Sequence, residues 1–114
     1  MRQRAPAVIW EGPPKWSRAR LLGHFKKKLL EKVDEAYLIG SYAAGTATGQ
    51  SDIDLIVVTP TLRPWPERGL PYLDLLKKYV DVDVLVYTPR EWETLRRNPT
   101  TFLAHAGRTW KRIL

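Results

Sequence analysis

Two aspartates at the head of an apolar run are the residues of this chain whose types and spacing could do chemistry. Asp52 and Asp54 belong to the stretch GSYAAGTATGQSDIDLIVV, which begins at Gly40 and ends at Val58. Side chains two residues apart on a strand share one face, so these two negative charges would repel each other. A buried carboxylate is unfavourable unless it is paired or binds a metal. The aspartates are therefore either solvated in a turn or part of a cation site.

A third acid could come from a later strand. The segment VDVDVLVY, residues 80–87, carries Asp81 and Asp83. These two have the same strand parity, so periodicity does not choose between them. If the strands are neighbours, one of this pair can meet Asp52 and Asp54. Three oxygen donors without His or Cys nearby suit a hard cation, Mg²⁺ or Mn²⁺, and argue against zinc.

The same chemistry predicts a phosphate-bearing ligand. Mg²⁺ usually takes one or two carboxylates together with substrate phosphates. Gly40 ends the strand predicted over residues 35–40 and would let backbone approach such a ligand closely. The Ser41 hydroxyl and the nearby amides can donate to phosphate oxygens.

Hydrophobic periodicity and turn residues predict helices that alternate with strands. Ser17 is a suitable N-cap for a helix that reaches about Val33, with one buried stripe at Leu21, Leu22, Phe25, Leu29, Leu30 and Val33. After it we expect, in chain order, strands over 35–40 and 53–58, a loop over 59–69, a helix over 70–79, a strand over 80–87, helices over 88–98 and 100–106, and an edge strand over 108–114. The continuous apolar run 53–58 is typical of a central strand buried on both faces.

Length and this alternation favour one small domain. The chain has 114 residues, close to the usual size of a domain, so we expect a single domain over residues 1–114 with an irregular arm over 1–14. Strands that alternate with helices point to a two-layer α/β or α+β sandwich. The sequence has no apolar run long enough to span a bilayer and no cysteine, so we expect no membrane contact and a cytoplasmic location.

The charge balance favours anionic partners without choosing among them. Lys and Arg number 19 against 12 Asp and Glu, a formal net charge of +7, which attracts nucleotides, nucleic acid or acidic proteins. Many of the basic residues lie on the first predicted helix, at Arg18, Arg20, Lys26, Lys27, Lys28 and Lys32. They are not interleaved with exposed aromatic residues, so a solvated face is favoured over a nucleic-acid surface.

The motif around the aspartates resembles that of a known family. The pattern Gly-Ser, ten residues, Asp-x-Asp, followed later by VDVDVLVYTPREWE, is similar to the minimal nucleotidyltransferases of the DNA polymerase β superfamily. The resemblance extends from about residue 30 to about residue 112. It implies an α/β (α+β) chain with the two-layer nucleotidyltransferase fold, a small mixed sheet with helices packed on it.

The resemblance also implies roles for the residues of the motif. Gly40 and Ser41 would contact the triphosphate of a nucleotide, and Asp52 and Asp54 would be ligands of two divalent ions, Mg²⁺ or Mn²⁺. Asp83 would be the third carboxylate, which binds one metal and helps deprotonate the attacking hydroxyl.

Two positions need separate comment: the third carboxylate and Ala44. Asp83 is preferred to Asp81 because it leads directly into an apolar run followed by Thr-Pro, as the family's catalytic acid does. The sequence departs from the family pattern at Ala44, where relatives often carry Arg, and this departure predicts weaker phosphate binding.

The activity that the resemblance implies is the metal-dependent transfer of a nucleoside monophosphate, AMP from ATP, to an acceptor hydroxyl. One-domain members of the family often act with a separate HEPN-domain protein, and some are antitoxins that adenylylate it, so a HEPN-type partner is implied. The alternative is a non-catalytic role, in which the chain neutralises such a partner or binds nucleic acid. In the loop over 59–69, Trp65 is expected near the site and Arg68 is expected to be solvated rather than bound to phosphate.

Overall fold

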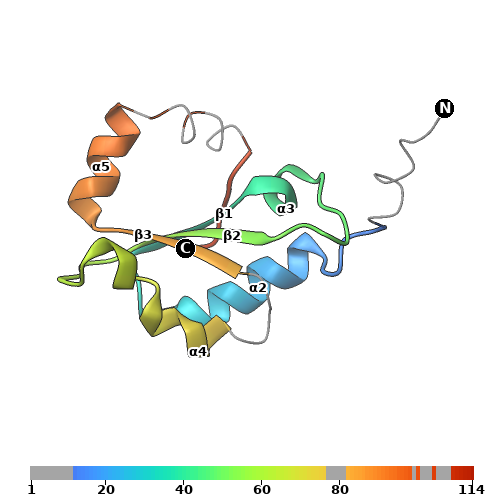
Figure 1. Cartoon of the computed structure of the whole chain (residues 1–114), viewed down its shortest axis with the longest axis horizontal. Helices are drawn as coiled ribbons and strands as arrows, with labels where there is room; N and C mark the ends of the chain where they lie inside the picture. The colour runs from blue at the N-terminus through green and yellow to red at the C-terminus, as the bar shows by residue number, and fades with distance from the viewer. Residues whose placement is uncertain (1–11, 77–81, 99, 101–103, 105–108) are drawn as a thin grey trace.

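The described part of the chain folds as a four-stranded mixed sheet with helices packed on it (Figure 1). This computed structural model describes residues 12–76, 82–98, 100, 104 and 109–114. The elements are α2 (Arg18–Leu29), β1 (Glu35–Ile39), α3 (Gly40–Ala44), β2 (Ile53–Val58), the 3₁₀ helices η1 (Trp65–Glu67) and η2 (Leu70–Tyr72), α4 (Leu73–Leu76), β3 (Val82–Tyr87), α5 (Pro89–Arg97) and β4 (Lys111–Arg112). The predicted fold class, α/β (α+β) with a small mixed sheet, is confirmed.

The strand order is β3-β2-β1-β4. β1 pairs antiparallel with both β2 and β4, whereas β2 and β3 run parallel. β2 is therefore central, and all of its residues except Asp54 are buried, as its apolar run predicts. The predicted edge strand near the C-terminus is confirmed as β4, which is only two residues long.

Helix α2 begins where the sequence predicts and ends earlier. The Ser17 side chain accepts a hydrogen bond from the Arg20 amide, as expected of an N-cap. The helix ends at Leu29 rather than near Val33, because Leu30 is extended (φ −55°, ψ 130°) and Glu31 has a φ of 66°. Leu30 consequently leaves the predicted stripe and is 51% exposed.

The sheet separates two apolar cores. One face is covered by α2 and α4, which lie on the same side of the sheet in Figure 1, and its core is mainly aliphatic. On the other face, Trp92 of α5 and Trp110 stack against Tyr37 of β1, with ring centroids 4.9–5.5 Å apart. Because neighbouring residues of a strand alternate between faces, Asp54 and Asp83 share the second face with Ile56 and Leu85.

The later elements agree with the sequence only in part. The helix expected over 70–79 begins as η2 followed by α4, and β3 covers residues 82–87 of the strand expected over 80–87. Helix α5 begins with a full capping box between Thr88 and Glu91. Most of the arm over 1–14 and of the helix expected over 100–106, and residues 77–81, lie outside the described residues.

None of the helices in the described ranges is both long and apolar enough to cross a membrane.

Candidate active site

Two of the predicted acids meet where the parallel strands β2 and β3 begin. In the register of this pair, Asp54 stands directly opposite Asp83. Asp81 lies outside the described residues, so the preference for Asp83 stays a prediction that this register supports. Asp52 is exposed and precedes the first residue of β2, which places it at the same end of the sheet.

Gly40 lies against Asp54 from the other side. The last residue of β1, Ile39, is paired with Asp54, so Gly40 follows directly beside that carboxylate. A Cβ atom added to Gly40 would lie 2.6 Å from Asp54 Oδ2, and the φ of Gly40 is +74°. Both the backbone conformation and the missing side chain are therefore needed at this position.

Gly40 and Ser41 begin a helix, which the sequence did not predict. Strand β1 stops at Ile39, one residue before the predicted end, and α3 follows at once. The helix ends in a left-handed Gly45 (φ 81°), and the amides of Gly45 and Thr46 both donate to the Ser41 carbonyl. The amides in the first turn of a helix have no acceptor within the helix, so Gly40 and Ser41 offer N–H donors next to the acids.

A tight turn over residues 48–51 places Asp52 just before β2. The Ser51 amide donates to the Thr48 carbonyl at 3.1 Å, and the Thr48 amide donates to Ser51 Oγ at 2.8 Å. The Gln50 amide donates to Thr48 Oγ1 at 3.2 Å. These side chains therefore hold the turn, and they explain why polar residues precede the strand.

The acids create an uncompensated negative region. Burial raises the pKa of Asp54 above its ordinary value, and the neighbouring charges of Asp83 and then Asp52 raise it further. Each ion pair in the described part of the chain is made by a glutamate, and none involves these three aspartates. A cation at this end of the sheet would relieve the repulsion.

The donor set fits a metal that also binds phosphate. In the described residues, no group of three or more His, Asp or Glu side chains is arranged to hold a metal by itself. The in-register pair Asp54 and Asp83 supplies two carboxylates, and Mg²⁺ commonly takes that number with the remaining ligands from phosphates and water. The residues thus fit an ion that arrives with a nucleotide better than a resident metal.

The proline-rich loop after β2 lies away from this site. β2 and β3 are parallel, so the loop leaves at the end opposite to the acids, where Trp65 stacks on Tyr87 at 5.3 Å. Tyr87 is four residues along β3 from Asp83, a separation of about 13 Å. The expectation that Trp65 lies near the site is wrong, because the strand length separates them.

Arg68 is not the solvated side chain that we expected. It donates to Glu91 through both terminal nitrogens, at 2.6 and 3.3 Å, and to the Val86 carbonyl at 3.3 Å. Its side chain is 13% exposed. Arg68 therefore joins the loop to the start of α5, a structural role far from the acids.

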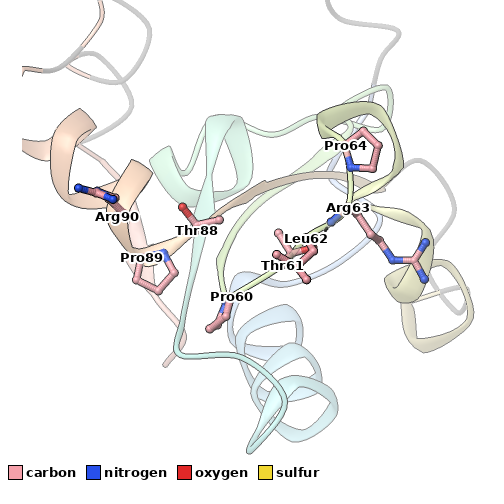
Figure 2. Close-up of a pocket in the computed structure, with 8 residues that line it drawn as sticks. All are labelled: Pro60, Thr61, Leu62, Arg63, Pro64, Thr88, Pro89 and Arg90. Carbon is pink, nitrogen blue, oxygen red and sulfur yellow. Dashed lines mark hydrogen bonds between the residues drawn. The ribbon is translucent and has the colours of Figure 1, made fainter.

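A wide pocket lies at the end of the sheet opposite to the acids and is lined by the segments that follow β2 and β3. Figure 2 shows Pro60–Pro64 on one side of it and Thr88, Pro89 and Arg90 on the other. The pocket has a volume of about 990 Å³. It contains none of the predicted site residues. The chemistry of the acids, rather than the size of a cavity, marks the candidate site.

One contact near the site could not be predicted from the sequence. Arg18, on the first turn of α2, donates from Nη1 to the Ala43 carbonyl in α3 at 2.8 Å. The pairing joins residues 25 positions apart and has no local signal in the sequence, where Arg18 belongs to a run of basic side chains.

A mixed sheet in which a Gly-Ser helix start lies beside strand aspartates is what the resemblance to nucleotidyltransferases predicts. Residues 19–70 match the family model described as a nucleotidyltransferase domain. This match, which covers less than half of the chain, confirms the predicted resemblance and indicates an enzyme of the transferase class. The matched range includes Gly40, Ser41, Asp52 and Asp54 and ends before Asp83.

Two solved structures are similar to this chain. A toxin–antitoxin structure with AMP-PNP is 24% identical, with a TM-score of 0.51 over 82% of this chain and 72% of that one. It shares the fold with this protein. A second match, tri-AMPylated Shewanella oneidensis HEPN toxin in complex with MNT antitoxin, is 19% identical, with a TM-score of 0.47 over 86% of this chain and 69% of that one. No curated protein matches this chain.

Proposed function

We propose that this protein transfers AMP from ATP to a hydroxyl group of a partner protein, with the help of divalent metal. In this reaction the acceptor oxygen forms a bond to the α-phosphorus, the bond from that phosphorus to the β-phosphate oxygen breaks, and pyrophosphate leaves. The observation that carries the proposal is the in-register pair Asp54 and Asp83 beside Gly40, whose missing side chain leaves the Asp54 carboxylate open.

Each residue of the site has a proposed role. Gly40 and Ser41 contact the triphosphate through the first amides of α3 and the Ser41 hydroxyl. Asp52, Asp54 and Asp83 hold the metal, two ions of Mg²⁺ or Mn²⁺ when the nucleotide is bound. The bound metal would offset the charge of the triphosphate and of the leaving pyrophosphate. Asp83, exposed at the start of β3, accepts the proton of the attacking hydroxyl.

We further propose a HEPN-type protein as the acceptor and an antitoxin role for this chain. The family resemblance supports this, and so does the toxin–antitoxin structure with AMP-PNP that shares the fold. ATP as the nucleotide has the same support, since AMP-PNP is an ATP analogue. The net charge of +7 favours an anionic nucleotide or an acidic partner surface.

Nucleotide binding provides the first test. Calorimetry with ATP and Mn²⁺ should give a binding isotherm for the wild type, and Asp54→Asn should weaken it strongly because a ligand charge is lost while the shape is kept. Asp74→Asn is the matched control, because it removes the same charge from an exposed position in α4. A wild type that gives no heat with ATP and Mn²⁺ would overturn the site assignment.

Transfer of label provides the second test. With ATP labelled at its α-phosphate, Mg²⁺ and a HEPN-domain protein as the acceptor, the wild type should label that protein. Asp54→Ala and Asp83→Ala should each lower the rate by about a thousandfold. A partner neutralised equally well by the wild type and by the double variant Asp52→Ala/Asp54→Ala would favour the non-catalytic alternative, to which Ala44 also points.

A further inference from the structure

The first turn of α2 holds the helix that carries Gly40 and Ser41. The Arg18 guanidinium donates to the Ala43 carbonyl, next to the last residue of α3, at 2.8 Å. Carbonyls in the last turn of a helix lack partners within the helix, and a cation there is favourable. The contact is thus a charged cap on α3 supplied by another element.

Helix α3 depends on contacts of this kind. It has five residues, far fewer than a helix needs to be stable by itself. Tyr42 and Ala43 anchor it in the core on the side of α2. Burial fixes how deep the helix lies, whereas a directional hydrogen bond at its far end also fixes how it is rotated about its axis.

A second bond from the N-terminal segment holds the stretch that follows. The Gly49 amide donates to the Gly12 carbonyl at 3.1 Å. Residues 12–18 therefore contact the chain between Gly40 and Asp52 at two points, once in α3 and once in the turn before the strand. The motif is therefore held at two internal points by a segment that is not itself part of it.

We propose that Arg18 is a positioning residue of the nucleotide site: through the Ala43 carbonyl it sets the orientation of α3 and with it the amides of Gly40 and Ser41. The inference rests on the proposed function, because it is Gly40 and Ser41 of α3 that are proposed to contact the triphosphate. A hydrogen bond from a charged donor contributes enough that its loss should weaken the binding of ATP with Mn²⁺ about tenfold.

Three variants separate position from charge. Arg18→Ala removes the bond, Arg18→Lys keeps a charged donor, and Arg20→Ala removes the same charge from an exposed neighbour on α2. Calorimetry with ATP and Mn²⁺ should show about tenfold weaker binding for Arg18→Ala, recovery of most of the affinity in Arg18→Lys, and at most a small loss for Arg20→Ala. Equal affinities for Arg18→Ala and Arg20→Ala would overturn the inference.

Hydrogen exchange without nucleotide tests the same contact independently. In Arg18→Ala, the amides of Gly45 and Thr46, which donate to the Ser41 carbonyl, should exchange at least several-fold faster. Amides of the central strand β2 should keep their protection, which shows that the variant is folded. Unchanged exchange at Gly45 and Thr46 would refute the positioning role. If the wild type fails to bind ATP, the proposed function fails while this measurement still decides whether Arg18 orders α3.

Discussion

Asp54 and Glu91 are acids at opposite ends of the same sheet, and their surroundings differ completely. Asp54 is partly buried among like charges, and burial, then Asp83, then Asp52 raise its pKa. At the other end, the Arg68 hydrogen bond, followed by the Thr88 amide, lowers the pKa of Glu91. The first carboxylate lacks the cation that the second one has.

The difference separates a site for binding from a site for stability. Glu91 closes a capping box and accepts both arms of the Arg68 guanidinium, so its charge is satisfied within the fold. Among the described residues no cation pairs with Asp54, and both burial and the neighbouring carboxylates disfavour its charged form. Such a group is expected where function rather than stability selects the residue. We therefore expect that removing the charge of Asp54 stabilises the fold and that removing the charge of Glu91 destabilises it.

The largest effect on stability is expected from Arg68→Ala. The variant removes the guanidinium that donates to Glu91 and to the Val86 carbonyl, leaving Glu91 only the Thr88 amide, and should lower the free energy of unfolding by about 2 kcal/mol. Urea denaturation followed by tryptophan fluorescence measures this. Arg97→Ala is the matched control, because its ion pair with Glu93 is exposed (73% and 54%) and should contribute less than about 0.5 kcal/mol. Similar losses in both variants would show that the two ion pairs are equivalent.

A smaller effect is expected at the glycines that flank α3. Gly40 and Gly45 both have positive φ, +74° and +81°, so alanine at either should lower stability by about 1 kcal/mol. Only at Gly40 would the added Cβ meet the Asp54 carboxylate, since nothing lies within 4 Å at Gly45. Gly40→Ala should therefore weaken the binding of ATP with Mn²⁺ well beyond Gly45→Ala. Equal binding by the two variants would argue against a site at Asp54.

The smallest effect on stability should be a gain. Without metal at neutral pH, Asp54→Asn removes a like charge from the pair with Asp83 and should stabilise the fold by about 0.5 kcal/mol. Because the folded protein holds the Asp54 proton more tightly than the unfolded chain, wild-type stability falls as pH rises from about 3.8 through the raised folded pKa. The advantage of Asp54→Asn should therefore appear over that range and vanish below it. A destabilised Asp54→Asn protein in EDTA at neutral pH would contradict the comparison.

Removal of the charge at Glu91 should change the dependence of stability on pH in the opposite direction. Its folded pKa is lowered, so its contribution is fully present above its ordinary value of 4.5 and is lost as pH falls through the folded pKa. Glu91→Gln keeps a residue that can close the capping box but removes the charge. The variant should be less stable than the wild type at neutral pH, and the two should converge in acid.

The sequence by itself determined the features that depend on neighbours along the chain. Ser17 caps its helix as predicted, and the helix predicted to start at Thr88 begins there, because helix starts depend on contacts with amides two or three residues away. The run 53–58 is a central strand, because a continuous apolar segment is stable only when both faces are covered. The Gly-Ser and Asp-x-Asp motif could also be found from the sequence, because it is defined by residue types and by the number of residues between them.

Tertiary structure alone decided which of these residues meet. The register that sets Asp54 opposite Asp83, the place of Gly40 against that pair, and the contact of Arg18 with α3 all join segments far apart in the sequence. Periodicity indicates which face a side chain shares but not which residue of a neighbouring strand it faces. It also could not show that Arg68 is held by Glu91 at the far end of the sheet, because an arginine in a proline-rich loop has the same local pattern whether it is solvated or paired. The chemistry of each acid follows from its partners, and the partners are chosen by how strands and helices pack.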